Sequence, residues 1–204
     1  ADLKFKEGDG PRFAVHTQST DKILVFGTNG RFYTLPCDKL PSARGHGEPI
    51  RLMIELGNEQ DIVQLEVFRG GRKFLVASDA GRGFVVPEDE VVAQTKNGKQ
   101  ALNLAQKERA VALSIMPEGA DSIAVLSEGR KLLIFPLEQV PEMSRGRGVL
   151  LQKSKADRLS EAQVFKLGDG LAVGNRVIAA GERKFCRGAR RQAGRQPEQG
   201  RARP

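Results

Sequence analysis

Arginine and lysine residues return beside glycine at regular places along this chain of 204 residues. One set follows or adjoins a turn glycine, and it comprises Arg31, Arg82 and Arg130. A second set lies in short glycine-containing loops, which read Arg44-Gly-His-Gly47, Lys96-Asn-Gly-Lys99 and Arg145-Gly-Arg-Gly148. A cation flanked by glycine suits a phosphate group, because glycine lets the backbone come close and offer its N–H groups. The pattern therefore predicts the binding of phosphates.

Groups that could carry catalysis are few and scattered. Tyr33 is the one tyrosine, and similar segments elsewhere place Val85, and Ile134 or a neighbour, at its position. A position that is apolar elsewhere is a packing position, so we expect Tyr33 in the core. The two histidines, His16 and His46, are too far apart in sequence to suggest a metal pair. His46 lies in a basic loop, where it could contact a phosphate or remain solvated.

Acidic residues and cysteines give no stronger signal of chemistry. The run Glu88-Asp-Glu90 could hold a metal ion, but a solvated turn is the expected state. Cys37 and Cys186 fit neither a disulfide framework nor zinc spacing, so we expect thiols, one at a strand end and one in the tail, in a reducing cytoplasm. The chain has no Gly-x-x-x-x-Gly-Lys-Ser/Thr sequence. We therefore expect no catalysis, no metal and no cofactor in this chain.

A threefold internal repeat must position the cations. Each unit holds an apolar strand, a polar turn with Gly and Arg, a second apolar strand and a closing proline, in residues 22–36, 73–87 and 122–136. Gly30, Gly81 and Gly129 give spacings of 51 and then 48 residues. Glycine accepts the positive φ of a tight hairpin, and proline ends a strand because it cannot donate to the ladder.

The second half of each unit repeats as well. After the basic loop we expect one strand in residues 50–56, 101–105 and 149–151, and another in residues 62–68, 110–116 and 162–167. Four strands in about fifty residues are typical of a propeller blade. Residues 171–195 look like a degenerate fourth unit, with Gly181–Lys184 as its turn and Arg190–Gly194 as its basic loop. Residues 12–18 are predicted to be a strand that completes a neighbouring blade.

Net charge is unevenly distributed along the chain. The formal charge is +8, from 33 Lys and Arg against 25 Asp and Glu, yet residues 1–180 contribute only +2 of it. The remaining +6 belongs to residues 181–204, which we expect to form a basic tail or a degenerate last half-blade. No apolar run is long enough to span a membrane, and no signal peptide is evident.

The repeat resembles a known family, the C-terminal domains of the A subunit of bacterial DNA topoisomerase IV, which are related to those of gyrase. The stretches that carry the resemblance are Leu3-Lys-Phe-Lys-Glu-Gly-Asp9, Gly30-Arg-Phe-Tyr-Thr-Leu35, Leu40-Pro-Ser-Ala-Arg-Gly-His-Gly-Glu-Pro49, Gly81-Arg-Gly-Phe-Val-Val86 and Asn97-Gly-Lys-Gln-Ala-Leu-Asn103. The similarity is strong up to about Leu167 and looser beyond it.

The resemblance implies an all-β fold, a β-pinwheel with strands exchanged between neighbouring blades. We expect about four to five blades of four strands in residues 1–180, with repeats near 22–68, 73–116 and 122–167; whether the ring closes is left open. It also implies a non-catalytic domain that binds and bends duplex DNA without sequence preference, presents the transported DNA segment and tunes the preference among supercoils and catenanes. The implied parent is an ATP-dependent type IIA topoisomerase of the bacterial cytoplasm and nucleoid, with ATP and Mg needed only by the holoenzyme. Its cleavage domain and B subunit are the implied protein partners, and the isolated domain is expected to be a monomer.

One departure from gyrase separates the two branches of the resemblance. Gyrase domains carry a Gln-Arg-Arg-Gly-Gly-Lys-Gly box, and the nearest stretch here is Ser144-Arg-Gly-Arg-Gly148. The incomplete box favours the topoisomerase IV branch over a gyrase-type domain that wraps DNA. A propeller-like module for protein interaction, without a nucleic-acid role, is the main alternative, because a fold alone does not assign a function.

The predicted DNA contacts are the recurrent cations together with basic residues near them. They are Arg31, Arg44, His46, Arg82, Lys96, Lys99, Arg130, Lys131, Arg145, Arg147, Lys153, Arg190 and Arg191. If the blades pack radially, equivalent loops project from equivalent places and form a curved row of cations.

Overall fold

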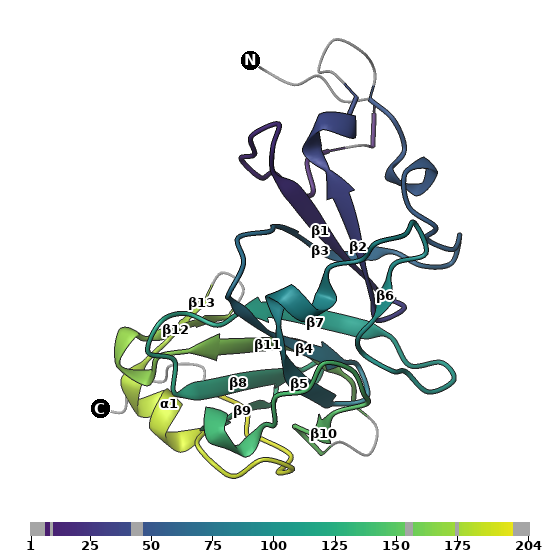
Figure 1. Ribbon diagram of the computed structural model, residues 1–204. Helices are drawn as coiled ribbons and strands as arrows, with labels where there is room; N and C mark the ends of the chain where they lie inside the picture. Colours follow the sequence, from purple (N-terminus) through teal and green to yellow (C-terminus); the bar gives the residue numbers. More distant parts are fainter. Residues whose placement is uncertain (1–6, 9, 42–46, 154–156, 174–175, 198–204) are drawn as a thin grey trace.

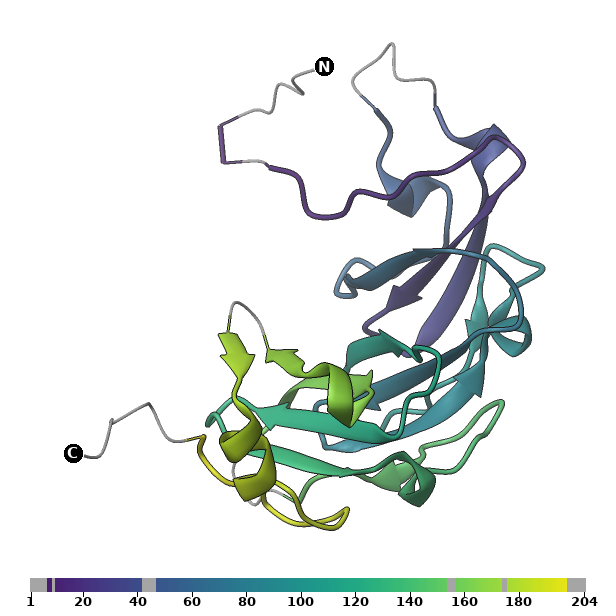
Figure 2. The same ribbon diagram turned by 90° about the vertical axis from the view of Figure 1, so that its left-hand side faces the viewer.

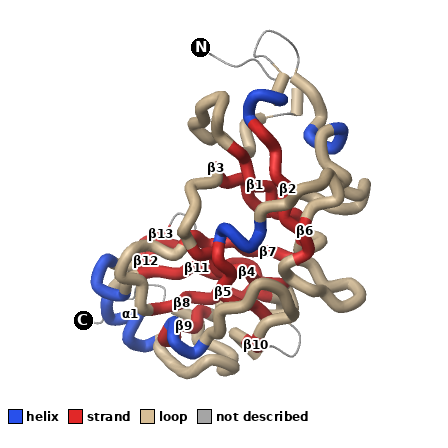
Figure 3. Tube along the Cα trace, in the orientation of Figure 1, coloured by secondary structure: helices blue, strands red, loops and turns tan. Residues whose placement is uncertain are grey.

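Four antiparallel β-sheets follow one another around an open crescent in the computed structural model (Figures 1 and 2). The structure describes residues 7–8, 10–41, 47–153, 157–173 and 176–197. The strands are β1 Lys22–Gly27, β2 Arg31–Pro36, β3 Ile62–Val67, β4 Lys73–Ser78, β5 Arg82–Pro87, β6 Lys99–Gln100, β7 Ala110–Ile115, β8 Ser122–Ser127, β9 Leu132–Pro136, β10 Val149–Leu150, β11 Leu159–Phe165, β12 Leu171–Val173 and β13 Arg176–Ile178. The all-β class predicted from the sequence is confirmed, and Figure 3 shows how little helix accompanies the strands.

Short helical turns follow each hairpin. They are the 3-10 helices η1 Cys37–Lys39, η3 Glu88–Val91 and η4 Leu137–Gln139, and the α-helix α1 Ala180–Phe185, while η2 Ile50–Leu52 and η5 Leu167–Asp169 lie in other loops. No helix among the described residues is long and apolar enough to cross a membrane.

Each blade is built on one of the predicted hairpins. β1 pairs with β2, β4 with β5 and β8 with β9, and the apolar side chains of these strands are largely buried. A third strand then pairs with the first strand of its hairpin, so that β3, β7 and β11 join β1, β4 and β8. β7 packs against both β3 and β11 near the middle of the molecule (Figure 1). We call these three strands the inner edge.

The outer edge of each blade is supplied by the next unit. β6, from the second unit, pairs with β2, and β10, from the third unit, pairs with β5. This arrangement confirms the strand exchange that the resemblance implied. The apolar core lies between blades: one cluster joins Phe26 and Phe32 of the first blade to Phe74 and Phe84 of the second.

The third hairpin turn differs from the repeat alignment by one residue. Backbone N–H groups of Gly30, Gly81 and Arg130 donate to the carbonyls that open their turns, so these three positions are equivalent. All three have positive φ, 75°, 77° and 59°. The equivalents of Arg31 and Arg82 are therefore not Arg130 but Lys131. The glycine of the third turn, Gly129, lies one residue earlier in its turn than Gly30 and Gly81 do in theirs, so alignment on glycine shifted the predicted register by one residue.

Several predicted strands are absent. Residues 12–18 form no strand, and Arg12 instead anchors this segment through an ion pair with Asp61 at 2.8 Å. Residues 50–52 form η2 rather than a strand. In the second unit the outer strand is β6, just before the expected residues 101–105, because pairing with β2 and not apolarity decides where it lies.

The fourth unit is a hairpin of two three-residue strands, β12 and β13. Gly181, the expected turn, lies inside α1, so that prediction is wrong. Residues beyond α1 return to the third blade: Cys186 carbonyl accepts from Ile134 N–H at 3.0 Å, and Arg195 exchanges two backbone hydrogen bonds with Leu132. This part of the basic tail thus takes the place of an outer strand beside β9, which it meets through isolated bridges.

Candidate nucleic-acid interface

Three segments occupy the outer edge of the blades. We call residues 96–103, 145–153 and 190–195 the exchange segments, because each comes from one unit and lies on the hairpin of the unit before it. Each passes through a glycine of positive φ, namely Gly98, Gly148 and Gly194. At each of these glycines an added Cβ would lie within 3 Å of a carbonyl oxygen of β2, β5 or β9. Only glycine allows such close contact with the strand.

The exchange segments also bond directly to one another. Asn103 N–H donates to the Gly146 carbonyl at 2.8 Å, and Gly146 N–H donates to the Ala101 carbonyl at 3.0 Å. Further along, Lys153 N–H donates to Gln192 at 3.1 Å and Arg191 N–H donates to Leu151 at 2.9 Å. The three segments therefore form one continuous band from blade to blade, which we call the outer ribbon.

All charged residues of the outer ribbon are basic. Eight of its residues are basic and none is acidic. The basic ones are Lys96, Lys99, Arg145, Arg147, Lys153, Arg190, Arg191 and Arg195. Side chains of Lys96, Arg145, Lys153 and Arg191 are exposed. A continuous row of exposed cations suits the regularly spaced phosphates of a nucleic-acid backbone.

Some ribbon cations have partners that position them. Arg145 Nε donates to Asn103 Oδ1 at 3.3 Å, within the ribbon itself. Arg147 pairs with Glu108 at 3.3 Å, and Lys99 lies 4.0 Å from Glu90. Arg190 Nη1 donates to the Leu150 carbonyl at 2.8 Å, and burial, with a contribution from Arg191, lowers the pKa of its guanidinium. Arg190 thus helps to hold the ribbon together.

Glu108 is the acidic partner of the ribbon residue Arg147, and its side chain is almost fully covered. Burial tends to raise the pKa of this carboxyl, but the Ser78 hydroxyl, the Ala105 N–H and Arg147 outweigh burial and hold the pKa below its ordinary value. Glu108 is therefore a charged structural anchor beneath Arg147.

The turn arginines mainly join neighbouring blades. Arg31 Nη1 donates to the Asn97 carbonyl at 3.1 Å, and Arg82 Nη1 donates to the Gly148 carbonyl at 3.3 Å. Each guanidinium thereby fastens an exchange segment to the hairpin on which it lies. Arg130 and Lys131, at the third turn, are exposed. Predicted contacts Arg44 and His46 lie outside the described residues.

Arg195 is the ribbon cation that the predicted set omitted. Its position follows Gly194 as Lys99 follows Gly98, and it pairs with β9 as Lys99 pairs with β2. The Gly-cation spacing in residues 194–195 was the available signal, but the expectation of a basic tail obscured it.

Residues weighed for catalysis have structural roles. Tyr33 is 1% exposed, and its hydroxyl donates to the Glu55 carbonyl at 3.2 Å, which confirms the core prediction. Strand register makes Phe84 and Leu133 its equivalents, one residue before the positions expected. No group of three or more His, Cys, Asp or Glu in the described part of the chain could hold a metal ion.

Glu88 is buried, so the prediction of a solvated turn at residues 88–90 is wrong for this residue. Its carboxylate pairs with Arg72 at 2.6 Å and accepts the Arg69 N–H at 3.1 Å. Burial tends to raise the pKa of Glu88, but Arg72 and the Arg69 N–H hold it below its ordinary value. Asp89 and Glu90 point elsewhere, to the Gly71 N–H and toward Lys99.

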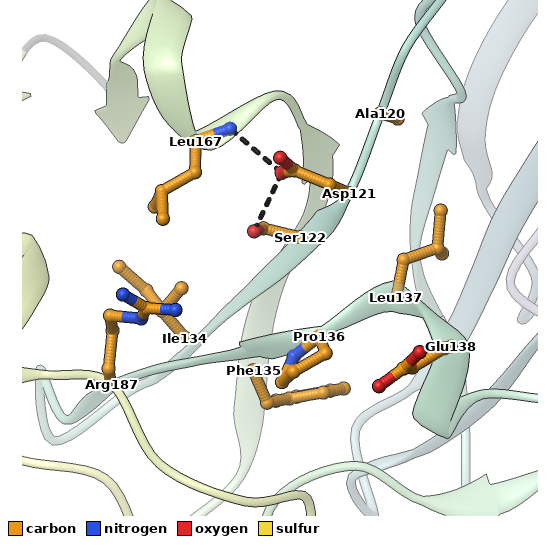
Figure 4. A pocket seen from close by; sticks show the side chains of 10 residues that line it. All are labelled: Ala120, Asp121, Ser122, Ile134, Phe135, Pro136, Leu137, Glu138, Leu167 and Arg187. Atoms are coloured by element: carbon orange, nitrogen blue, oxygen red, sulfur yellow. Dashed lines mark hydrogen bonds between the residues drawn. The ribbon is translucent and has the colours of Figure 1, made fainter.

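A hollow of about 510 Å³ lies beside the base of the third hairpin (Figure 4). Figure 4 shows Asp121 on one side of it and Arg187 on the other. Asp121 accepts the Leu167 N–H at 2.9 Å and the Ser122 hydroxyl at 2.8 Å, and these bonds lower its pKa. Because the carboxylate already accepts from two local donors, it acts as a loop anchor rather than as an acid or base.

Comparison with known proteins agrees with this architecture. The family model described as the DNA gyrase C-terminal domain, beta-propeller, matches residues 21–69, 72–115 and 121–161. The A subunit of DNA topoisomerase 4 from Caulobacter vibrioides is 48% identical over 170 residues, which are 83% of this chain and 22% of that protein. The same protein from Rickettsia bellii is 42% identical over 170 residues, 83% of this chain and 23% of that protein. The chain thus spans less than a quarter of the length of these relatives.

Solved structures extend the similarity over the whole crescent. The Escherichia coli ParC C-terminal domain superposes with a TM-score of 0.81 at 26% identity, over 97% of this chain and 84% of that chain. The C-terminal domain of DNA topoisomerase IV in another structure gives a TM-score of 0.74 at 19% identity, over 86% of this chain and 58% of that chain, and shows the same fold. With its repeats, its exchanged strands and these relatives, the chain belongs to the family of C-terminal domains found in the A subunits of gyrase and topoisomerase IV.

Proposed function

We propose that this domain binds and bends duplex DNA along the outer ribbon, and that it presents the transported segment to a type IIA topoisomerase. The observation that carries the proposal is the ribbon itself, with eight cations and no carboxylate in three segments that bond edge to edge. In the parent enzyme we expect the cleavage domain and the B subunit, with ATP and Mg, to supply the chemistry in the bacterial cytoplasm. The domain itself supplies binding and geometry, and thereby tunes the preference among supercoils and catenanes.

Contacts of this kind read phosphates and not bases. Arginine and lysine side chains on the ribbon meet the DNA backbone, which fixes orientation without a sequence code. Glycines beside them let the main chain approach the duplex closely. Binding should therefore be nearly independent of sequence and should weaken steeply with salt as counterions are released.

Because the crescent is curved, we expect the domain to bend the duplex that it binds. The ribbon passes from the first blade to the third around the crescent, so a duplex that meets all three exchange segments must bend (Figure 2). Bending a site of 20–30 base pairs costs on the order of 1–6 kcal/mol, which contacts to the additional segments must offset. Loss of the cations at one end of the ribbon should therefore reduce the bend as well as the affinity.

The decisive experiment reverses one exposed cation from the first exchange segment and two from the second. The variant combines Lys96→Glu, Arg145→Glu and Lys153→Glu, and its affinity for a duplex of mixed sequence is measured by fluorescence anisotropy over a range of salt. If each of these side chains meets one phosphate, the slope of log K against log salt should fall by about 0.9 for every phosphate that is no longer neutralised. Ligase-mediated circularisation of short duplexes measures the bend.

A matched control reverses three exposed cations that lie outside the ribbon, Arg69, Arg109 and Lys166. It changes the net charge by the same amount, so a nonspecific effect of charge would weaken both variants alike. Retention of tight, salt-dependent binding by the folded ribbon variant, or equal loss in the control, would overturn the proposal.

A further inference from the structure

A hollow of about 450 Å³ lies at the base of the first hairpin, and we call it the first-blade hollow. Part of its lining is apolar, through Leu35, Leu52, Met53 and Val92. The Leu52 side chain is 69% exposed, although most large apolar side chains of the described chain are buried. A segment that enters the hollow can therefore bury apolar area against Leu52.

The charged lining of the first-blade hollow is entirely basic. Lys22, Lys39 and Lys96 line it, and no acidic residue does. All three lysines are exposed. The ion pairs formed within the described part of the chain use other cations. The hollow thus combines apolar contacts with three positive charges that no described carboxylate pairs with.

The second blade shows what lies at the same place in the repeat. Lys73 has the register position of Lys22, since each is opposite the closing proline of its hairpin. Lys73 Nζ pairs with Glu142 Oε2 at 2.6 Å. Glu142 bridges to Val85 of β5, and the next residue, Met143, packs against the core cluster of the first two blades. An acidic residue followed by a large apolar one therefore lies at the base of the second hairpin.

The first blade lacks this acidic residue. Ala93 and Glu142 each stand six residues after the closing proline of their unit. Ala93 N–H donates to the Thr34 hydroxyl at 2.9 Å, and Thr34 has the register position that Val85 has in β5. Because the side chain of Ala93 is a methyl group, it cannot pair with Lys22. The segment from the next unit thus reaches the first hairpin without supplying the charge that it supplies to the second.

The hollow at the third hairpin differs from the first in its charge. Asp121 and Glu138 line it together with Arg187, so both signs are present. An excess of positive charge is therefore not a general property of hairpin bases in this fold, and the sequence of the first unit creates it.

We propose that the first-blade hollow docks an extended acidic segment of a partner protein. In this segment a glutamate or aspartate pairs with Lys22, and a large apolar residue that follows it packs on Leu52 and Met53. Charge complementarity favours such a partner, because it brings the carboxylates that the lining lacks. A DNA backbone would also bring negative charge, but phosphates and sugars offer no apolar side chain to cover Leu52.

The test measures the binding of a fluorescein-labelled peptide to the full chain by fluorescence anisotropy at low salt. The peptide is Glu-Gln-Val-Pro-Glu-Met-Ser, which copies residues 138–144 at the base of the second hairpin. It should bind saturably to one site. A second peptide has lysine in place of the glutamate that corresponds to Glu142. Its affinity should be about fivefold lower, the upper range for an exposed ion pair.

Two variants of the chain locate the site. Lys22→Glu should weaken the first peptide by a similar factor and should strengthen the second peptide, because the ion pair forms again with its signs exchanged. Leu52→Asp should weaken the first peptide by about tenfold, since the apolar contact is lost. Lys166→Glu, at an exposed lysine of the third unit, makes the same charge change as Lys22→Glu and should leave both peptides unaffected. Lys22 and Leu52 are exposed, so both variants should stay folded, and circular dichroism verifies this.

Several results would overturn the proposal. One is the absence of saturable binding of the first peptide to the wild-type chain. Another is an equal response of the two peptides to Lys22→Glu. A loss of duplex affinity in Lys22→Glu without any peptide binding would mean that the hollow serves DNA instead. Neither Lys22 nor Leu52 belongs to the outer ribbon, so failure of this test and failure of the ribbon test are distinguishable.

Discussion

The inner edge and the outer ribbon are opposite in charge although both are built from the same repeat. β3, β7 and β11 contain Glu66 and Glu161 and no lysine or arginine, while the outer ribbon contains eight cations and no carboxylate. A hollow of about 410 Å³ along the inner edge is lined by Gln64, Glu66, Ser114, Glu161 and Gln163 among others. Residues 1–180 carry a net charge of only +2, so these residues hold almost as many acidic as basic side chains. The two surfaces therefore differ because the repeat places acidic and basic residues at different edges of the blades.

The buried ion pair between Arg72 and Glu88 joins the inner strand of the first blade to the hairpin of the second blade. Arg72 Nη2 donates to the Val67 carbonyl at the end of β3 and to Glu88 after β5, so it joins the inner strand to the hairpin. Glu88→Ala should lower the free energy of unfolding by about 3 kcal/mol, the lower end for a broken buried pair, since Arg72 keeps 26% of its side chain exposed. Urea denaturation measures the loss. The exposed neighbour change Glu90→Ala should cost far less, and an equal cost for both would contradict this account.

Glycines of the outer ribbon should be far less tolerant than their copy in the first unit. Gly148→Ala places a Cβ 2.3 Å from the Gly83 carbonyl oxygen, so the backbone must move. We expect a loss of about 2–3 kcal/mol and weaker DNA binding, because the ribbon opens. Gly47→Ala should cost only about 1 kcal/mol, the left-handed strain alone. Thermal unfolding and fluorescence anisotropy of the two variants measure the losses of stability and of DNA affinity. Equal losses for Gly148→Ala and Gly47→Ala would contradict the difference expected between the two glycines.

Acid should affect the fold before it affects the ribbon. Hydrogen bonds and ion pairs hold the pKa values of Asp61, Glu88 and Glu108 below their ordinary values. A depressed carboxyl pKa stabilises the fold fully above the unfolded value of about 4, and this contribution is lost as the pH falls toward the folded value. We therefore expect the urea midpoint to be level near neutral pH and to fall below about pH 4. Between about pH 7.5 and 9, by contrast, lysine and arginine stay charged and histidine stays neutral, so DNA affinity should be unchanged.

Adding cations to the inner edge tests whether position or net charge governs binding. Glu66→Lys with Glu161→Lys raises the net charge by four units, but on strands that face away from the outer ribbon. We expect only a small rise in duplex affinity and no change in the bend, as measured by anisotropy and circularisation. An increase as large as the decrease caused by the ribbon variant would mean that overall charge, and not the ribbon, holds DNA.

The third hairpin turn offers the smallest effect. Arg130 occupies the left-handed position that Gly30 and Gly81 fill in the other turns. Arg130→Gly should raise the free energy of unfolding by about 0.5–1 kcal/mol, because glycine adopts this conformation without steric strain. Chemical denaturation measures the gain, with Lys131→Gly as the control that should not stabilise. If Arg130→Gly also leaves the salt slope of DNA binding unaltered, Arg130 makes no phosphate contact.

The sequence periodicity predicted the three hairpins correctly, because the alternation of apolar residues, the turn glycines and the closing prolines are local signals. The same periodicity did not predict where the outer strands lie. Residues 50–56 and 101–105 are as apolar as real strands, but whether they pair depends on a partner from another unit. Likewise Glu88 reads as one of three solvated acids, and only the approach of Arg72 from the preceding loop makes it a buried ion pair.

The sequence by itself determined the repeat, the all-β class and the return of cations beside glycine about every fifty residues, because these follow from short-range chemistry. Which of these cations lie together on the outer ribbon follows only from the tertiary structure. The guanidinium groups of Arg31 and Arg82 fasten neighbouring loops, while the tail takes the place of an outer strand in the third blade, where Arg195 bridges to β9. The reason is strand exchange: each blade is completed by a segment from the next unit, so the neighbours of a residue are set by packing between units and not by its own stretch of chain.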